Sequence, residues 1–464
     1  MPPTLTTAFY GALTASLVLY VYRFAVGGMN LSAFRALFLA WLTWLAVDVV
    51  RGRVRFERRL RPFALVVAAL VAVNAVDFLA LGGYPALRRD IANHLVNVGL
   101  TGLVLVYVDT WAKVHALLRA FVLSSLVTTA VTVYAGVFDH LPFESLIRTF
   151  GSTLGQQLAY VSDDAEFQRA TSSFFDPNFY GIYSLLVVVV IVHLWLFERP
   201  SWWLAALFAM NLVCLTLTLS RTAVVGLFAA MALAFLLERR VRIFAVATVI
   251  ATVGLLYAST VFQSHSQYER FVKETRAFVT RWTQPQPPAE RAPTAGATPT
   301  TPPRARPYGD AVPSDDIQER VANTRSLATR VEYIERGLSV FRASPIWGGG
   351  SASLLTKDVR WSSAHVSYVT LLARYGILGA LAYLAFLLVP IAVVWRRPRQ
   401  TADRFLVTVP TAALMVVYLS YDILLFFEIQ YLLFGVAWAI AFNLPAVDSM
   451  RAPAPGAAPA ASAG

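Results

Sequence analysis

One histidine stands where it could act as a base beside a membrane. His365 comes at the end of a long polar segment, just before an apolar run that begins at Ser367. Imidazole is the side chain best suited to accept a proton near neutral pH, because its ordinary pKa is about 6.5. The competing interpretation is a histidine that only caps the helix or bonds a carbonyl. Its position at the start of a span, facing arginine-bearing loops, favours the base.

Arginines on the same predicted side of the chain could bind phosphate. Arg221 lies in Ser220-Arg221-Thr222 at the junction of two apolar runs, where a guanidinium can hold a phosphate through two parallel hydrogen bonds. An arginine that only snorkels to the membrane surface is an equal alternative. Arg330 flanks the apolar stripe of a predicted loop helix, and Arg325 competes with it. Taken alone, both fit an ordinary solvated charge.

Acidic residues give weaker signals. Asp176 and Asn178 precede an apolar run, which is typical of a helix start. The acidic pairs at 163–164 and 315–316 do not predict a metal site, because a divalent ion needs several convergent oxygens and the second pair can cap a helix. Three further histidines on this predicted side lack metal-ligand spacing: His94, His140 and His265. We therefore expect neither a metal nor another cofactor.

The composition requires a membrane to position these residues. The chain has 464 residues, 57% of them hydrophobic and 14% charged, and its mean hydropathy is +0.58. These values exclude a soluble globular protein, and runs near the ~20-residue bilayer span predict helices rather than a barrel. The formal charge of +12 does not predict nucleic-acid binding, because arginines in short loops between spans orient a membrane protein. The first apolar stretch is followed directly by others, so no cleavable signal peptide is expected.

Hydropathy predicts an all-α polytopic membrane protein with about twelve transmembrane helices. Arginines cluster at residues 51–61, 239–242 and 396–404, in alternate loops. By the positive-inside rule, both termini are expected in the cytoplasm. The expected spans are 6–26, 31–50, 62–82, 92–110, 115–137, 177–197, 201–220, 222–238, 242–263, 367–395, 405–425 and 427–446.

Two of the loops on the outer side are long. Within the larger, residues 284–313 hold nine prolines, which predicts a disordered surface linker. From Ile317 to Phe341, apolar residues recur at helical spacing, and Pro345 ends the helix. The expected parts are residues 1–263 with nine spans and an outer loop at 138–176, a large, partly helical periplasmic loop at 264–366, three spans in 367–446, and a disordered cytoplasmic tail at 447–464.

Three motifs together resemble the O-antigen ligase and O-antigen polymerase superfamily. The segments 364–368 and 375–379 are similar to its His-Asn-x-Tyr…Gly-(Ile/Leu)-(Ile/Leu)-Gly signature, with Val366 replacing the usual Asn. The segment from Arg330 to residues 345–350 is similar to its arginine helix ending in Pro-x-x-Gly-x-Gly. Ser-Arg-Thr at 220–222 is similar to its outer Ser-Arg pair. The resemblance covers roughly residues 174–390.

The resemblance implies a membrane-embedded glycosyltransferase, GT-C-like in fold, inverting and metal-independent. His365 would be the base and Arg221 and Arg330 would bind the donor diphosphate. Arg325, Asn178 and Tyr368 are further candidate substrate-binding residues. The implied donor is a glycan on undecaprenyl diphosphate, the acceptor is the lipid A–core oligosaccharide, and the other partners are membrane lipids, with no nucleic acid.

The implied location is the inner membrane of a Gram-negative bacterium, with the active site facing the periplasm. A polymerase that joins lipid-linked glycans, or a protein O-oligosaccharyltransferase, could use the same residues. A polysaccharide transporter is a weaker alternative. It would place ionisable groups near the bilayer midplane and contain two repeated halves, and neither is seen.

Overall fold

The computed structural model is predominantly helical in the residues that it describes, as expected for this class of membrane protein. Residues Met1–Leu255 and Tyr333–Gly464 form one compact unit, and Leu256–Glu332 form a second. The described residues are 3–19, 22–26, 29–54, 60–80, 85–138, 160–164, 167–174, 176–218, 220–262, 324–350, 354, 366–398, 401–424 and 427–444.

Each of the twelve expected spans overlaps one long helix, and a thirteenth described helix, Thr324–Ala343, falls in the outer loop expected at 264–366. The helices are α1 (Pro3–Val18), α2 (Ala33–Val50), α3 (Arg61–Ala80), α4 (Pro85–Tyr107), α5 (Trp111–Phe138), α6 (Pro177–Phe197), α7 (Trp202–Leu217), α8 (Arg221–Leu237), α9 (Arg242–Phe262), α12 (Thr324–Ala343), α13 (Ser367–Arg396), α14 (Thr401–Val417) and α15 (Glu428–Phe442), with a 3₁₀ turn η3 (Arg239–Val241).

The expectation of an all-α chain needs a small correction. Strands β1 (Arg23–Val26) and β2 (Met29–Ser32) pair antiparallel, and so do β3 (Tyr160–Asp164) and β4 (Phe167–Ala170). The first hairpin occupies the end of the first expected span, so α1 ends earlier than hydropathy indicates. The second lies inside the outer loop expected at 138–176. Hydropathy averages over many residues and cannot detect strands of four or five residues.

Helix boundaries in the polar segments differ from the expected ones. The helix expected from Ile317 is α12, which is described from Thr324, while residues 317–323 lie outside the described part. The Pro-rich segment 284–313 and the tail from residue 447 lie outside it as well. The span expected at 405–425 is α14, which already ends at Val417. Polar residues after that point take part in the site described below.

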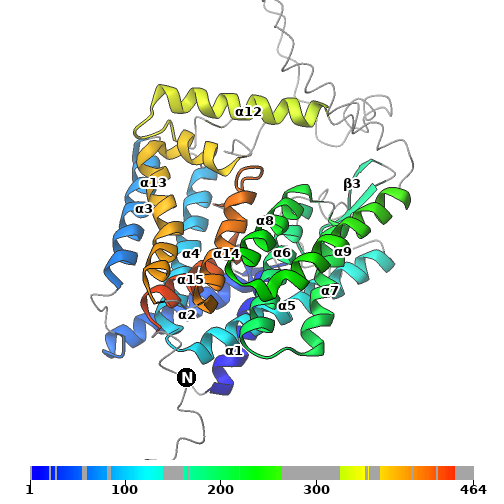
Figure 1. Ribbon diagram of the computed structural model, residues 1–464. Coiled ribbons are helices and arrows are strands. Elements are labelled where there is room, and N and C mark those ends of the chain that lie inside the picture. The colour runs from blue at the N-terminus through cyan, green and yellow to red at the C-terminus, as the bar shows by residue number, and fades with distance from the viewer. Residues whose placement is uncertain are drawn as a thin grey trace, which may run out of the picture. The chain divides into compact units, whose positions relative to one another are not determined.

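Two groups of neighbouring helices make up the larger unit. In one group α13 packs against α3 and α15, and α15 packs against α4 (Figure 1). In the other, α6 packs against α7 and α8, and α8 packs against α14. Contacts of α13 and α15 with α14 join the groups, and α6 is almost entirely buried between its neighbours. A helix that is apolar all round is expected at such a central position.

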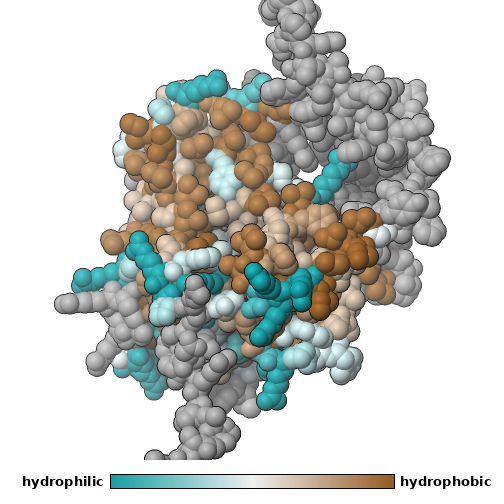
Figure 2. All heavy atoms as spheres, in the orientation of Figure 1, coloured by the Kyte–Doolittle hydropathy of each residue, from teal (hydrophilic) through white to brown (hydrophobic). Residues whose placement is uncertain are grey.

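The outer surface of the helices is apolar. On the face shown in Figure 2, hydrophobic residues cover much of the described surface, and hydrophilic residues gather in a few clusters. Four described helices are long and apolar enough to cross a membrane: 33–50, 111–135, 177–197 and 367–396. Shorter apolar helices occupy 93–107, 202–217, 221–237 and 428–442. Exposed apolar side chains belong on a lipid-facing surface: Leu39, Trp44, Leu65, Leu123, Leu236, Ile243, Ile250 and Leu381. That all twelve helices cross the bilayer stays a prediction.

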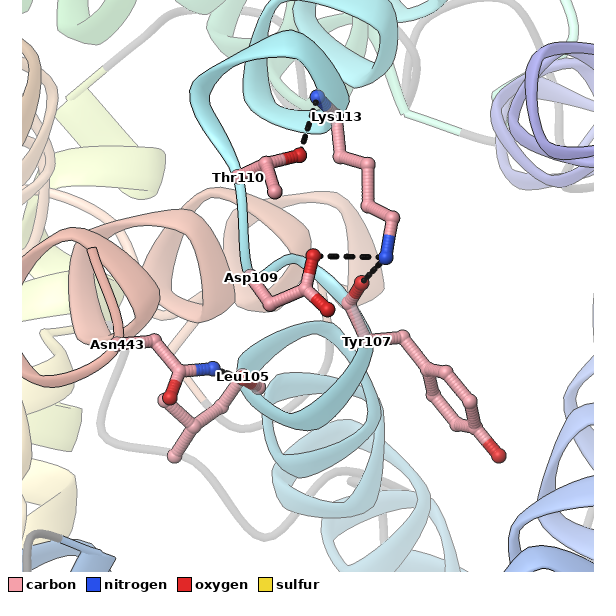
Figure 3. Close-up of polar contacts among 6 residues, drawn as sticks. All are labelled: Leu105, Tyr107, Asp109, Thr110, Lys113 and Asn443. Atoms are coloured by element: carbon pink, nitrogen blue, oxygen red, sulfur yellow. Dashed lines mark hydrogen bonds and ion pairs between the residues drawn. The ribbon is translucent and has the colours of Figure 1, made fainter. Parts of the chain in front are cut away.

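Polar side chains hold the turn between α4 and α5 in place (Figure 3). Lys113 Nζ lies 2.7 Å from Asp109 Oδ1 and donates to the carbonyl of Tyr107 at 3.1 Å. Asn443, just after α15, donates to the carbonyl of Leu105 at 2.5 Å. The end of α15 is therefore tied to the end of α4 at the side predicted to be cytoplasmic.

A second polar cluster at this end joins α5 to the turn after α6. Glu198 Oε2 accepts from Arg119 at 2.7 Å, and its Oε1 lies 2.8 Å from His115 Nδ1. Burial raises the pKa of Glu198, but hydrogen bonds from His115 and Arg119 outweigh burial and hold the pKa below its ordinary value. The carboxylate form therefore stabilises the folded state.

Helix α13 is broken at Gly376, where φ is 63° and ψ is −164°. The loop that follows α12 fills the break. Gly349 N–H and Gly350 N–H donate to the carbonyls of Ala373 and Arg374 at 2.8 and 3.1 Å. In return, Ile377 N–H donates to the carbonyl of Pro345 at 2.9 Å. Peptide groups freed by a broken helix need such partners inside a membrane protein.

Only glycine fits at the centre of this contact. Gly376 has a positive φ, and a Cβ there would collide with the carbonyl of Ile346. Gly348 also has a positive φ (75°), and a Cβ there would lie 2.5 Å from Tyr375 N. The two glycines thus allow two backbones to touch. This contact gives the quoted Pro-x-x-Gly-x-Gly and Gly-Ile-Leu-Gly segments one shared structural role.

Candidate functional site

Polar side chains gather where α6, α8 and α13 begin. We call this region the site end, and it also includes residues 418–424 after α14. Each of the three helices starts here, so the positive ends of their dipoles lie on the same side of the bundle. Such helix starts favour a bound anion.

The start of α6 is fixed by a capping carboxylate. Asp176 Oδ1 accepts from Asn178 N–H at 2.6 Å, which confirms the helix-start role expected for Asp176. Its Oδ2 accepts from the Tyr421 hydroxyl at 2.5 Å. Asn178 Oδ1 accepts from Ser220 Oγ at 2.9 Å. Asn178 therefore joins α6 to the residue that caps α8.

Arg221 is the first residue of α8 and its side chain is exposed. Ser220 caps this helix by accepting from Ala223 N–H at 3.3 Å. The turn before it packs closely on α6, because a Cβ on Gly181 would lie 2.8 Å from Thr218 Oγ1. A rigid turn thus presents the guanidinium at a helix start, a position suited to phosphate binding.

The start of α13 is held by a second carboxylate. Asp422 Oδ1 accepts from Ser367 Oγ at 3.1 Å, and its Oδ2 accepts from Thr370 Oγ1 at 2.6 Å. Ser367 N–H donates to the carbonyl of Tyr418 at 3.1 Å. Ser367 and Thr370 are fully buried. The first turn of α13 is therefore anchored to the residues after α14.

The structure describes some of the candidate residues in full and others only in part or not at all. His365 lies outside the described residues, two positions before α13. Arg325 and Arg330 lie on α12, in a part where only the backbone is described. Tyr368 is half-buried, and its hydroxyl donates to the carbonyl of Met415 at 3.0 Å. Of the candidates, Arg221 and Asn178 lie on neighbouring helix starts joined by Ser220.

Sequence reasoning did not identify the residues after α14 as part of a site. Ser420, Tyr421 and Asp422 fall inside the span expected at 405–425. The signal was a polar triplet within an otherwise apolar run, just before Ile423. Ser420 Oγ donates to Thr222 Oγ1 at 3.1 Å, so the triplet touches all three helix starts.

No three His, Cys, Asp or Glu side chains converge as a metal site in the described part of the chain. The acidic pair at 163–164 lies in β3, where side chains are not described, and the pair at 315–316 lies outside the described residues. His94 is fully buried and its Nε2 lies 2.8 Å from the Tyr383 hydroxyl. This histidine belongs to a packed network inside the helices.

That network continues to a buried ion pair. Arg374 NH2 lies 3.8 Å from Asp77 Oδ2, and each side chain is only 1% exposed. One turn earlier on α3, Asn74 Oδ1 accepts from the Tyr375 hydroxyl at 3.1 Å. Two residues of α3 therefore hold the two residues of α13 that precede its break. Burial of both charges makes either partner costly to remove alone.

The apolar helices indicate a membrane protein, and its polar site end presents the exposed Arg221 at a helix start. Residues 205–384 match the family model described as O-antigen ligase, which supports membership of the O-antigen ligase superfamily. No curated protein matches the sequence. The matched segment includes Arg221, α12, the glycine contact and the first part of α13. This match indicates activity of the O-antigen ligase or polymerase type, with lipid-linked glycans as substrates in a membrane.

Proposed function

We propose that the protein transfers O-antigen polysaccharide from undecaprenyl diphosphate to a hydroxyl of the lipid A–core oligosaccharide. The family match over the segment that carries Arg221 and the start of α13 is the observation that carries this proposal. The reaction inverts the anomeric centre and uses no metal. It takes place at the periplasmic face of the inner membrane and completes lipopolysaccharide.

The proposed roles follow from the chemistry of a sugar diphosphate. Diphosphate is a good leaving group, so the reaction mainly needs cations for the departing charge and a base for the acceptor hydroxyl. Arg221 and Arg330 bind the diphosphate, supported by the positive start of α8. His365 takes the proton from the acceptor. Arg325, Asn178 and Tyr368 complete the binding surface.

The proposed topology places both termini in the cytoplasm and the site end in the periplasm. All twelve helices α1–α9 and α13–α15 cross the bilayer. The arginine clusters at 51–61, 239–242 and 396–404 support this orientation. So does the nature of the substrates, because a lipid-linked donor and acceptor meet at a membrane surface.

Two other activities use the same donor. A polymerase would extend one lipid-linked glycan with another, and a protein O-oligosaccharyltransferase would use a protein hydroxyl. The decisive experiment offers the purified protein in lipid nanodiscs a glycan on undecaprenyl diphosphate, with lipid A–core, with a candidate protein acceptor, or without an added acceptor. We expect the glycan on lipid A–core. Growth of the lipid-linked glycan alone would replace ligase with polymerase.

The base is tested in the same assay with His365→Gln. Glutamine keeps hydrogen bonding but cannot take the proton, so turnover is expected to fall ~10²–10⁴-fold while donor binding is kept. Wild-type turnover should also decline as the pH falls through the imidazole pKa. His115→Gln, in α5 at the opposite end, is the matched control and should turn over normally. Normal turnover by His365→Gln, or loss of activity with EDTA that a divalent metal restores, would refute the mechanism.

A further inference from the structure

Two neighbouring residues after α14 hold different helix starts at the site end. Tyr421 contacts the cap of α6, and Asp422 contacts the first turn of α13. We propose that Tyr421 is a positioning residue for the donor half of the site, and that Asp422 is a positioning residue for the half that carries the base. This assignment rests on the proposed function.

The donor half is connected to Tyr421 through a chain of hydrogen bonds. The Tyr421 hydroxyl donates to Asp176 Oδ2 at 2.5 Å, while Oδ1 of the same carboxylate caps α6 at Asn178 N–H. The Asn178 side chain accepts from Ser220, the residue that caps α8 and precedes Arg221. A shift of the Asp176 carboxylate is therefore passed to the turn that presents the guanidinium. The same turn also meets Ser420 through Thr222.

The base half is connected to Asp422 through two hydroxyls. Thr370 Oγ1 donates to Asp422 Oδ2 at 2.6 Å and Ser367 Oγ donates to Oδ1 at 3.1 Å. Both hydroxyls sit on the first turn of α13, and His365 is two residues before that turn in the chain. Losing the anchor frees the turn that directly follows this histidine in the chain. Asp422 does not need to touch substrate to have this effect.

The two connections use different carboxylates, and Ser367 Oγ also lies 3.1 Å from the backbone carbonyl of Tyr421, a contact that side-chain substitutions at Tyr421 and Thr370 leave in place. A hydrogen bond from a hydroxyl to a carboxylate is stronger than one between neutral groups, so removing a single hydroxyl has a measurable effect. Tyr421→Phe and Thr370→Val are matched in this respect. Each variant deletes one hydroxyl bound to a carboxylate and keeps the shape of the side chain.

Tyr107→Phe is the control. The Tyr107 hydroxyl donates to Asp48 Oδ2 at 3.1 Å, at the opposite end of the helices from the site end. This variant also deletes one hydroxyl bound to a carboxylate and keeps the shape of the side chain.

The experiment uses the full chain in nanodiscs and measures the Kd for undecaprenyl diphosphate, kcat at saturating donor, and the pH dependence of kcat. Tyr421→Phe is expected to raise Kd about tenfold, the order of one hydrogen bond to a charged group, with kcat within about twofold of wild type. Thr370→Val is expected to lower kcat about tenfold and shift its pH midpoint, with Kd unchanged. Tyr107→Phe should leave all three values near wild type.

The outcomes separate two failures. A wild-type protein that neither binds undecaprenyl diphosphate nor transfers a glycan overturns the proposed function, and the assignment falls with it. A wild-type protein that does both, while Tyr421→Phe and Thr370→Val match it or change Kd and kcat in parallel, overturns only the assignment. Parallel changes in these two variants, together with a lower Tm in both, identify a structural role for the connection.

Discussion

Arg221 combines three features that favour phosphate binding: a planar guanidinium, a helix start and an exposed position on a capped turn. Lysine would keep the charge but lose the two parallel hydrogen bonds that a guanidinium gives to phosphate. We expect Arg221→Lys to weaken binding of undecaprenyl diphosphate ~10–100-fold, the range of one or two lost charged hydrogen bonds. Arg240→Lys is the control, because its side chain is 79% exposed and lies beyond the other end of α8. Equal donor affinity in both variants would mean that Arg221 contributes only its positive charge to donor binding.

Glu198 offers a prediction on stability rather than activity. Its pKa is lower in the folded state than its ordinary value of 4.5, so its stabilising effect is complete above that value and is lost as the pH falls through the folded pKa. Arg119 is 55% exposed, so Glu198→Gln is expected to lower the free energy of unfolding by less than about 1 kcal/mol. Thermal unfolding at pH 7 should show that Glu198→Gln is less stable than wild type, and this difference in stability should be smaller near pH 4. A difference that grows toward acid would contradict the ion-pair account.

At the scale of elements, the break in α13 is the most demanding feature. Gly376→Ala is expected to lower the free energy of unfolding by about 2–4 kcal/mol, because alanine combines a positive φ with a collision against the Ile346 carbonyl. Gly254→Ala is the matched control, since nothing lies within 4 Å of the added Cβ and its φ is not positive. That control should be neutral or slightly stabilising. Thermal unfolding of both in detergent is the measurement, and equal Tm values would mean that the loop after α12 can move away.

Sequence patterns located the elements better than they located the contacts between them. Apolar runs of about twenty residues predicted the helix that contains Gly376, and the glycine segments were recognised as a signature. Their shared role depends on a backbone contact between residues about thirty positions apart, which no local pattern encodes. Asp422 was missed for a related reason. A short polar triplet barely lowers the average hydropathy of a long window, so the helix was extended past Val417 and the site residues were counted as span.

At the scale of the whole molecule, the predicted orientation in the membrane can be tested by labelling introduced cysteines. Cys214 is the one cysteine in the chain and is buried. In a Cys214→Ser background, Leu419→Cys marks the site end and Arg240→Cys the opposite end, and both native side chains are exposed. A membrane-impermeant maleimide added to intact cells with a permeabilised outer membrane should label only Leu419→Cys. Arg240→Cys should react after the inner membrane is opened. The reverse pattern would invert the topology.

The Pro-rich segment 284–313 should contribute little to activity. Nine prolines among small and polar residues cannot form a packed core, and changes in such loops have small effects on stability. Replacing the segment with a Gly/Ser linker of similar length should keep kcat within about threefold, because loop-closure entropy depends weakly on length and composition. Transfer to lipid A–core is the measurement. Loss of transfer with wild-type expression would make the segment part of the site.

The contact between the loop after α12 and the break in α13 also has a consequence for how the protein is made. The loop precedes α13 in the chain, so under the proposed topology it has been exported before the translocation machinery receives α13. The freed carbonyls of Ala373 and Arg374 therefore meet their partners, Gly349 and Gly350, from the outer side as the helix enters the lipid. A helix with this break would be poorly inserted if the order of the two segments were exchanged. The order of the two segments along the chain therefore makes the loop available before α13 is inserted.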